Sequence, residues 1–341
     1  MKIYHLSHTD LDGYGAQYIT NFYFKDVKFL NSNYGREIDD KFAQILSEID
    51  ASNDDKNVIL ITDLNLTPAQ CESFEEMIEG KNIKLFLLDH HQSGAECAST
   101  YSWYFLDSSR CATKITYDFF AGIFGKNKEL EIFSDVVNAV DIWLKDDKNF
   151  EMGKVCLGLV ANAKEINKVM FEAENNLYMD HILKEASKFF NEKNDYIGLD
   201  MQVHAIKKSF FKEDKDDTLS NLISNYVVKK LSENKEKFSI TYKDHKGILT
   251  YNVGNVSVIG NDFLVANPEF DFFIDVTNKK TLSFRANGKL DVSAMAKHLV
   301  GGGGHVNASG GLFANFKDGF SYEPIKAQIV DLITKKTQEE I

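Results

Sequence analysis

The chain has 341 residues, of which 43% are hydrophobic, so it can bury the cores of two domains of ordinary size. Its 51 acidic and 39 basic residues give a net charge of −12, which excludes the broad basic surface that binds long nucleic acids. A phosphorylated substrate would therefore be short and held by local cations or metal ions. The four cysteines are widely spaced without a CxxC pair, and indicate neither a zinc knuckle nor a disulfide framework.

The sequence shows no membrane segment and no export signal. The start of the chain lacks an apolar run of signal length, and no stretch approaches the roughly 20 apolar residues of a membrane span. We therefore expect a cytoplasmic protein with no membrane partner. Its oligomeric state stays open, and a homodimer is one option.

Residues 1–148 alternate short apolar runs with stretches of helical spacing such as Ile38 to Ile49 and Pro68 to Glu79. This alternation predicts an α/β domain with a mostly parallel sheet and helices on both faces. Ligands bind such sheets at the carboxyl ends of the strands. The predicted strands are Lys2 to Ser7, Asp26 to Leu30, Asn57 to Thr62, Ile83 to Leu88 and Tyr101 to Leu106.

Two further regions follow along the chain. Residues 149–237 are charged and helical in pattern, and we interpret them as a helical connector. Residues 238–341 predict a smaller α/β domain that ends in a helix over Asp291 to Val300 and the glycine run Gly301 to Gly304. The strands predicted there are Phe238 to Tyr242, Gly247 to Asn252, Val256 to Ile259, Phe272 to Val276 and Thr281 to Ala286.

Acidic and histidine residues follow several predicted strands of the first domain. An aspartate after a strand is more often a turn former or helix cap than a ligand. Several clusters at neighbouring strand ends would converge, however, and packed carboxylates repel unless cations bind between them. Carboxylate and imidazole ligands together suit Mn²⁺, Fe²⁺ or Co²⁺ better than Mg²⁺. The candidate ligands are His8, Asp10, Asp12, Asp63, His90 and, on a predicted helix, Asp141.

Six candidate ligands exceed what one ion needs when it keeps a water molecule. Two ions about 4 Å apart that share a bridging carboxylate would use them all. Such a pair would lower the pKa of a bound water and stabilise charge on a phosphoryl group. The residues therefore favour a two-metal phosphoesterase.

These motifs resemble the DHH phosphoesterase superfamily, named for the triplet that is Asp89-His90-His91 here. Gly301-Gly302-Gly303-Gly304-His305 resembles the signature of its partner domain DHHA1. The resemblance implies that His8 and Asp10 bind one metal ion, most often Mn²⁺, and that Asp12, His90 and Asp141 bind the other. Asp63 would bridge the two, His91 would contact the scissile phosphate, and Asp89 would orient its neighbours.

Within that superfamily the chain looks most like the NrnA/NrnB-type nanoRNases, the oligoribonucleases. The resemblance implies a DHH catalytic domain in residues 1–148 and a DHHA1 substrate-binding domain in residues 238–341. Successive glycines let a backbone approach a ligand closely and form an anion-binding nest. Substrate contacts are expected from Arg285, Gly302, Gly303, Gly304, His305 and Asn307. Arg110 could contact substrate or form a surface salt bridge.

The main hypothesis is a metal-dependent phosphodiesterase that hydrolyses short oligoribonucleotides or linear dinucleotides such as pGpG and pApA to nucleoside 5′-monophosphates. A phosphomonoesterase acting on 3′-phosphoadenosine 5′-phosphate is one alternative. A non-catalytic nucleotide-binding sensor is another. All six candidate metal ligands and His91 are present, which argues against the sensor, because a non-catalytic protein could lose some of these residues.

Overall fold

A computed structural model describes residues 1–52, 56–190 and 195–338. The chain divides into two compact units, residues 1–163 with 176–206, and residues 164–175 with 207–341. Residues 149–237, the predicted connector, contribute to both units. Residues 191–194 of that range and 339–341 of the last predicted domain lie outside the described residues. The functional division into catalytic, connecting and substrate-binding domains stays a prediction.

The first unit is built on a parallel sheet of five strands in the order β2-β1-β3-β4-β5. Short apolar strands alternate with helices along the chain, as the sequence predicts. Each helical connection brings the chain back to the amino end of the next parallel strand. The strands are β1 (Lys2–Ser7), β2 (Val27–Asn31), β3 (Asn57–Thr62), β4 (Ile83–Asp89) and β5 (Tyr104–Leu106).

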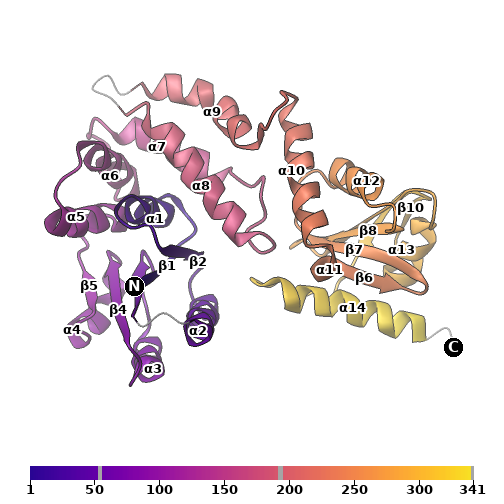
Figure 1. The fold of residues 1–341 in the computed structure, drawn as a ribbon, viewed down its shortest axis with the longest axis horizontal. Coiled ribbons are helices and arrows are strands. Elements are labelled where there is room, and N and C mark those ends of the chain that lie inside the picture. The colour runs from indigo at the N-terminus through magenta and orange to yellow at the C-terminus, as the bar shows by residue number, and fades with distance from the viewer. Residues whose placement is uncertain (53–55, 191–194, 339–341) are drawn as a thin grey trace. The chain divides into compact units, whose positions relative to one another are not determined.

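Helices cover both faces of this sheet (Figure 1). On one face, Phe42 and Phe74 stack within a core of buried aliphatic side chains from the strands. This arrangement confirms the predicted α/β fold of the first domain. The helices are α1 (Leu11–Tyr23), α2 (Arg36–Ala51), α3 (Pro68–Ile78), α4 (Ala95–Thr100), α5 (Ala112–Phe124), α6 (Lys128–Asp141), α7 (Phe150–Ala161) and the 3-10 turn Gln92–Gly94.

Two long helices, α8 (Glu172–Ser187) and α9 (Tyr196–Phe211), each contain one of the boundaries between the units, at residues 175/176 and 206/207. The second unit continues with α10 (Leu219–Glu233) and α11 (Lys235–Phe238). Among the described residues, no helix combines the length and apolar character that crossing a membrane requires.

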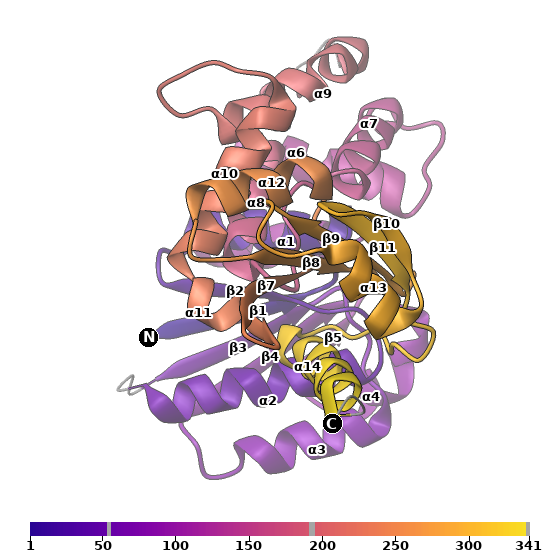
Figure 2. The ribbon, with the colours of Figure 1, turned by 90° about the vertical axis from the view of Figure 1, so that its right-hand side faces the viewer.

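The second unit contains a mixed sheet of six strands in the order β10-β11-β9-β8-β7-β6. Helices α10 and α12 lie on one face, and α14 lies on the other (Figure 2). Its strands are β6 (Ser239–Tyr242), β7 (His245–Tyr251), β8 (Phe272–Val276), β9 (Thr281–Ala286), β10 (Gly303–His305) and β11 (Ala308–Leu312), and its remaining helices are α12 (Val256–Ala266), α13 (Val292–Val300) and α14 (Tyr322–Gln338).

One predicted strand of this unit is wrong. Val256 to Ile259 forms the first turn of α12, because the Asn255 side chain caps that helix by accepting a hydrogen bond from the backbone N–H of Val258. The apolar run was short enough to suit either structure, and the buried positions Ile259 and Phe263 have helical spacing.

Candidate metal centre

The predicted ligands lie where three neighbouring strands end. Strand β1 ends one residue before His8, β3 ends one residue before Asp63, and β4 ends at Asp89, directly before His90. Because β1, β3 and β4 are adjacent and parallel, these side chains meet at one edge of the sheet. Asp141 reaches the same place from the last residue of α6.

His8, Asp10 and Asp63 form the first of two groups. The Nδ1 atom of His8 lies 2.9 Å from Asp10 Oδ2 and 3.6 Å from Asp63 Oδ2. Nevertheless, among the described residues, neither His8 Nδ1 nor Asp63 Oδ2 has a hydrogen-bond partner of suitable geometry, although both atoms are buried. Buried polar atoms left in this state are costly, and a cation between them would satisfy both.

The second group surrounds the imidazole of His90. Its Nε2 atom lies 3.3 Å from Asp63 Oδ1, 3.6 Å from Asp141 Oδ2 and 3.7 Å from Asp12 Oδ2. Asp63 thus directs one oxygen toward each group. This is the position expected of a bridging ligand, and a nitrogen with three carboxylates around it suits a divalent ion such as Mn²⁺.

The backbone at two positions is shaped for this arrangement. Asp63 has a φ of +56°, a left-handed conformation that costs a non-glycine residue on the order of 1 kcal/mol and often marks a functional site. At Gly13, a Cβ atom would lie 2.3 Å from the carbonyl oxygen of His8, so only glycine fits. The N–H of Gly13 donates to Asp10, which caps α1.

The carboxylates of the two groups repel one another, and this repulsion shifts their pKa values. Burial, and then the charge of Asp12, raise the pKa of Asp141 to about 8 and that of Asp63 well above its usual range. Burial alone would lower the pKa of His8, but the neighbouring Asp10 and Asp63 raise it to about 10. The residues present therefore fit two divalent ions, which would replace this mutual repulsion with attraction.

Asp12 is the most constrained of the six residues. Its side chain is buried, and its two oxygens each accept a backbone hydrogen bond of 2.7 Å from the first turn of α5, from Ala112 and Thr113. A carboxylate oxygen keeps a second lone pair, so Asp12 can still bind a cation. Its position is fixed by a helix that begins a hundred residues downstream.

His91 and Asp89 form a pair beside the ligands. Asp89 is fully buried, and its Oδ1 lies 2.7 Å from His91 Nδ1 while its Oδ2 accepts a 2.8 Å hydrogen bond from the Tyr104 hydroxyl. His91 Nδ1 can donate a hydrogen bond to this carboxylate, because a carboxylate oxygen accepts. The other nitrogen, Nε2, lies 3.0 Å from the Tyr34 hydroxyl and points away from Asp89.

Sequence reasoning missed three residues of this site, namely Tyr34, Tyr104 and Cys111. Tyr34 follows the end of β2 and Cys111 lies between β5 and α5, so the rule that ligands gather at strand ends could have found both. Arg110 donates to Asp107 and Asp118, which is the salt-bridge alternative that the sequence left open, and its contact with substrate stays a prediction.

The glycine run in the second unit is part of regular secondary structure and is not a flexible loop. Gly301, with a φ of +68°, ends α13, and the N–H groups of Gly301 and Gly302 donate back to Lys297 and Ala296 of that helix. Gly303 and Gly304 continue directly into the edge strand β10. Two of the four N–H groups are therefore occupied within the unit, and are not available to an anion.

Arg285 and His305 nevertheless lie in one row of the second sheet. Arg285 is opposite Ala308, and Ala308 is opposite His305. Opposite residues point to the same face, so the Arg285 and His305 side chains flank a small alanine across about 10 Å of sheet. The Arg285 guanidinium donates to Ser257 and to the carbonyl of Phe284, and Asn307 accepts from the N–H of Gly288.

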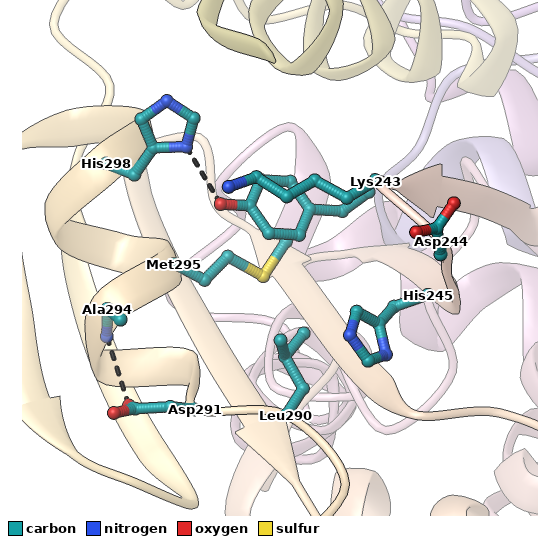
Figure 3. A pocket seen from close by; sticks show the side chains of 9 residues that line it. Lys243, Asp244, His245, Leu290, Asp291, Ala294, Met295 and His298 are labelled. Atoms are coloured by element: carbon teal, nitrogen blue, oxygen red, sulfur yellow. Dashed lines mark hydrogen bonds between the residues drawn. The ribbon is translucent and has the colours of Figure 1, made fainter. Parts of the chain in front are cut away.

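A separate cavity of about 360 Å³ opens on the second unit between the β6–β7 turn and α13 (Figure 3). The Tyr242 hydroxyl and His298 Nδ1 lie 2.8 Å apart at one side of it. None of the residues that line this cavity is among the predicted substrate contacts. It is lined by Tyr242, Lys243, Asp244, His245, Leu290, Asp291, Ala294, Met295 and His298.

Two glycines of the run provide a matched pair for a stability prediction. A Cβ atom at Gly302 would lie 2.2 Å from the carbonyl oxygen of Gly310, whereas one at Gly303 would meet nothing within 4 Å. We expect Gly302→Ala to lower the free energy of unfolding by about 1–3 kcal/mol, and Gly303→Ala to change it by less than about 0.5 kcal/mol. Urea denaturation of both variants checks this, and equal stability would contradict it.

Comparison with known proteins places the chain in a family. No protein-family model matches it. A 3′,5′-cyclic-nucleotide phosphodiesterase from Helicobacter pylori (strain ATCC 700392 / 26695) is 41% identical over 343 residues, which cover 97% of this chain and 99% of the relative. A crystal structure of an uncharacterized protein from Helicobacter pylori G27 is 40% identical, with a TM-score of 0.92 over 98% of this chain and 99% of that one. The chain therefore belongs to the same protein family as the Helicobacter pylori 3′,5′-cyclic-nucleotide phosphodiesterase.

Proposed function

We propose that this chain is a metal-dependent phosphodiesterase that acts on small nucleotides. The observation that carries the proposal is the position of Asp63, which directs one oxygen to His8 and the other to His90. In this proposal two divalent cations, preferably Mn²⁺, are held by His8, Asp10 and Asp63 on one side and by Asp12, Asp63, His90 and Asp141 on the other. The ions would activate water and stabilise charge on the phosphoryl group.

The protein's own residues supply position and proton control. Asp89 holds the His91 imidazole in one orientation through Nδ1. When Nε2 carries a proton, it can donate that proton to a phosphoryl oxygen or to the leaving group. The Tyr104 hydroxyl donates a hydrogen bond to the other oxygen of Asp89 and holds that carboxylate in place. This arrangement supports the roles that the sequence suggested for Asp89 and His91.

The substrate class is proposed from two observations. The family relative is named for 3′,5′-cyclic nucleotides, and the net charge of −12 disfavours long polymers. We therefore propose 3′,5′-cyclic nucleotides, linear dinucleotides and short oligoribonucleotides as substrates, cleaved to nucleoside monophosphates. The resemblance to the DHH/DHHA1 superfamily, and to its nanoRNases, is part of this proposal.

The test is a substrate panel with the metal-free protein and with added Mn²⁺. The panel holds 3′,5′-cyclic AMP, pGpG, pApA, a short RNA and 3′-phosphoadenosine 5′-phosphate, with products separated by chromatography. We expect hydrolysis of at least one phosphodiester and none after chelation. Release of phosphate from the last compound alone would indicate the phosphomonoesterase. Binding of two ions without turnover of any compound would contradict the proposal and favour a sensor.

A prediction for the second unit concerns Arg285, which we propose as a phosphate contact. Replacing it with lysine keeps the charge but removes the forked guanidinium. We expect Arg285→Lys to raise KM by about tenfold and to change kcat by less than about threefold. The lost contact would stabilise the bound substrate and the transition state equally, and the reacting groups are unchanged. Ser257→Ala, which removes only the hydroxyl that Arg285 contacts, is the matched control and should leave KM near the wild-type value. Unchanged KM in the lysine variant would contradict the assignment.

A further inference from the structure

Cys111 lies against the second group of candidate ligands. Its Sγ atom and one carboxylate oxygen each of Asp12 and Asp141 all lie within 4.8 Å of one another. The thiol is fully buried, at the position that precedes the first residue of α5. No comparable thiol accompanies the first group, His8, Asp10 and Asp63, within the ranges that the structure describes.

Cys111 is held in place by the same elements that carry the ligands. Its backbone N–H donates a 2.8 Å hydrogen bond to the side chain of Asn138, which lies one helical turn before Asp141 on α6. The two residues that follow Cys111 donate their N–H groups to Asp12. Backbone hydrogen bonds thus hold this segment against α6 and against Asp12, which places the thiol near both carboxylates.

A second observation concerns Asp63, the carboxylate that the two groups share. Asp63 is 2% exposed, and its Oδ2 atom, which faces His8 of the first group, has no hydrogen-bond partner among the described residues. Its other oxygen lies 3.3 Å from His90 Nε2, which also faces Asp12 and Asp141. Buried polar atoms without partners are rare unless an ion or water satisfies them.

We propose that Cys111 is a sulfur ligand of the cation held by Asp12, His90 and Asp141, so that the two metal positions differ in chemistry. This inference rests on the proposed function, because it assumes a divalent ion in that group. On binding, the thiol S–H bond breaks, the proton passes to solvent, and a sulfur–metal bond forms. Thiolate is a soft ligand, so this position prefers Co²⁺, Zn²⁺ or Cd²⁺ over Mn²⁺ relative to the first position.

The test uses the full chain, stripped of metal and titrated with Co²⁺. A cobalt–thiolate bond produces a charge-transfer absorption band in the near ultraviolet that oxygen and nitrogen ligands do not. We expect this band in the wild type, and its loss in Cys111→Ser. That variant should fold, because serine is a favoured residue before a helix. Cys156→Ser is the matched control, since Cys156 is fully buried on α7 and burial alone raises the pKa of its thiol to about 12.

Affinity supplies a second readout that does not depend on activity. We expect Cys111→Ser to weaken binding of one Cd²⁺ ion by at least about tenfold and to change Mn²⁺ affinity by less than about threefold. Two bound cobalt ions without the band in the wild type, or a full band in Cys111→Ser, would overturn the inference and leave the proposed function standing. Failure of every divalent ion to bind the wild type would overturn both.

Discussion

Replacing Asp63 with asparagine is expected to lower kcat for phosphodiester hydrolysis by about a thousandfold or more, because one side chain faces both proposed metal positions. Asparagine tolerates the left-handed backbone at this position, so the variant should keep its fold. Steady-state kinetics with saturating Mn²⁺ measures the effect, together with the number of ions bound per chain.

Stability separates a loss of catalysis from a loss of structure in this variant. Asp63 is buried beside other carboxylates, so removal of its charge relieves repulsion in the metal-free protein. We therefore expect Asp63→Asn to unfold at the same or a higher temperature than the wild type in chelator, and to gain less when Mn²⁺ is added. Asp50→Asn, which removes only an exposed ion pair with Lys81, is the control and should behave like the wild type. Full activity of Asp63→Asn would contradict the bridging role.

His91 carries the second large expected effect. Replacing it with glutamine keeps a hydrogen-bonding side chain but removes the imidazole that Asp89 orients. We expect kcat for a nucleotide substrate to fall by about a hundredfold or more, a typical cost of losing a positioned acid. The assay compares this substrate with bis(p-nitrophenyl) phosphate, whose leaving group needs no proton.

The comparison of the two substrates decides what His91 does. A fall confined to the nucleotide substrate indicates proton donation to the leaving group, whereas equal falls indicate a hydrogen bond to the phosphoryl oxygens. Tyr34→Phe removes only the hydroxyl beside Nε2 and should cost less than about tenfold. A loss of less than threefold in His91→Gln would contradict either role.

The sequence by itself determined where the strands of the first unit end and which side chains follow them. Strand patterns are local, and parallel strands bring their carboxyl ends to one edge, so His8, Asp63 and His90 could be placed together without coordinates. The reason for Gly13 came from the structure, in which the turn after His8 leaves no room for a Cβ atom.

Only the tertiary structure decided how the far elements complete the site. Asp12 is fixed by the first turn of α5, and Cys111 reaches Asp141 through the packing of α5 and α6, neither of which periodicity encodes. The glycine run illustrates the same limit in the second unit. Its composition suits a loop, but Gly301 ends a helix and Gly303 begins an edge strand, because the surrounding helix and sheet supply hydrogen-bond partners that the sequence alone does not show.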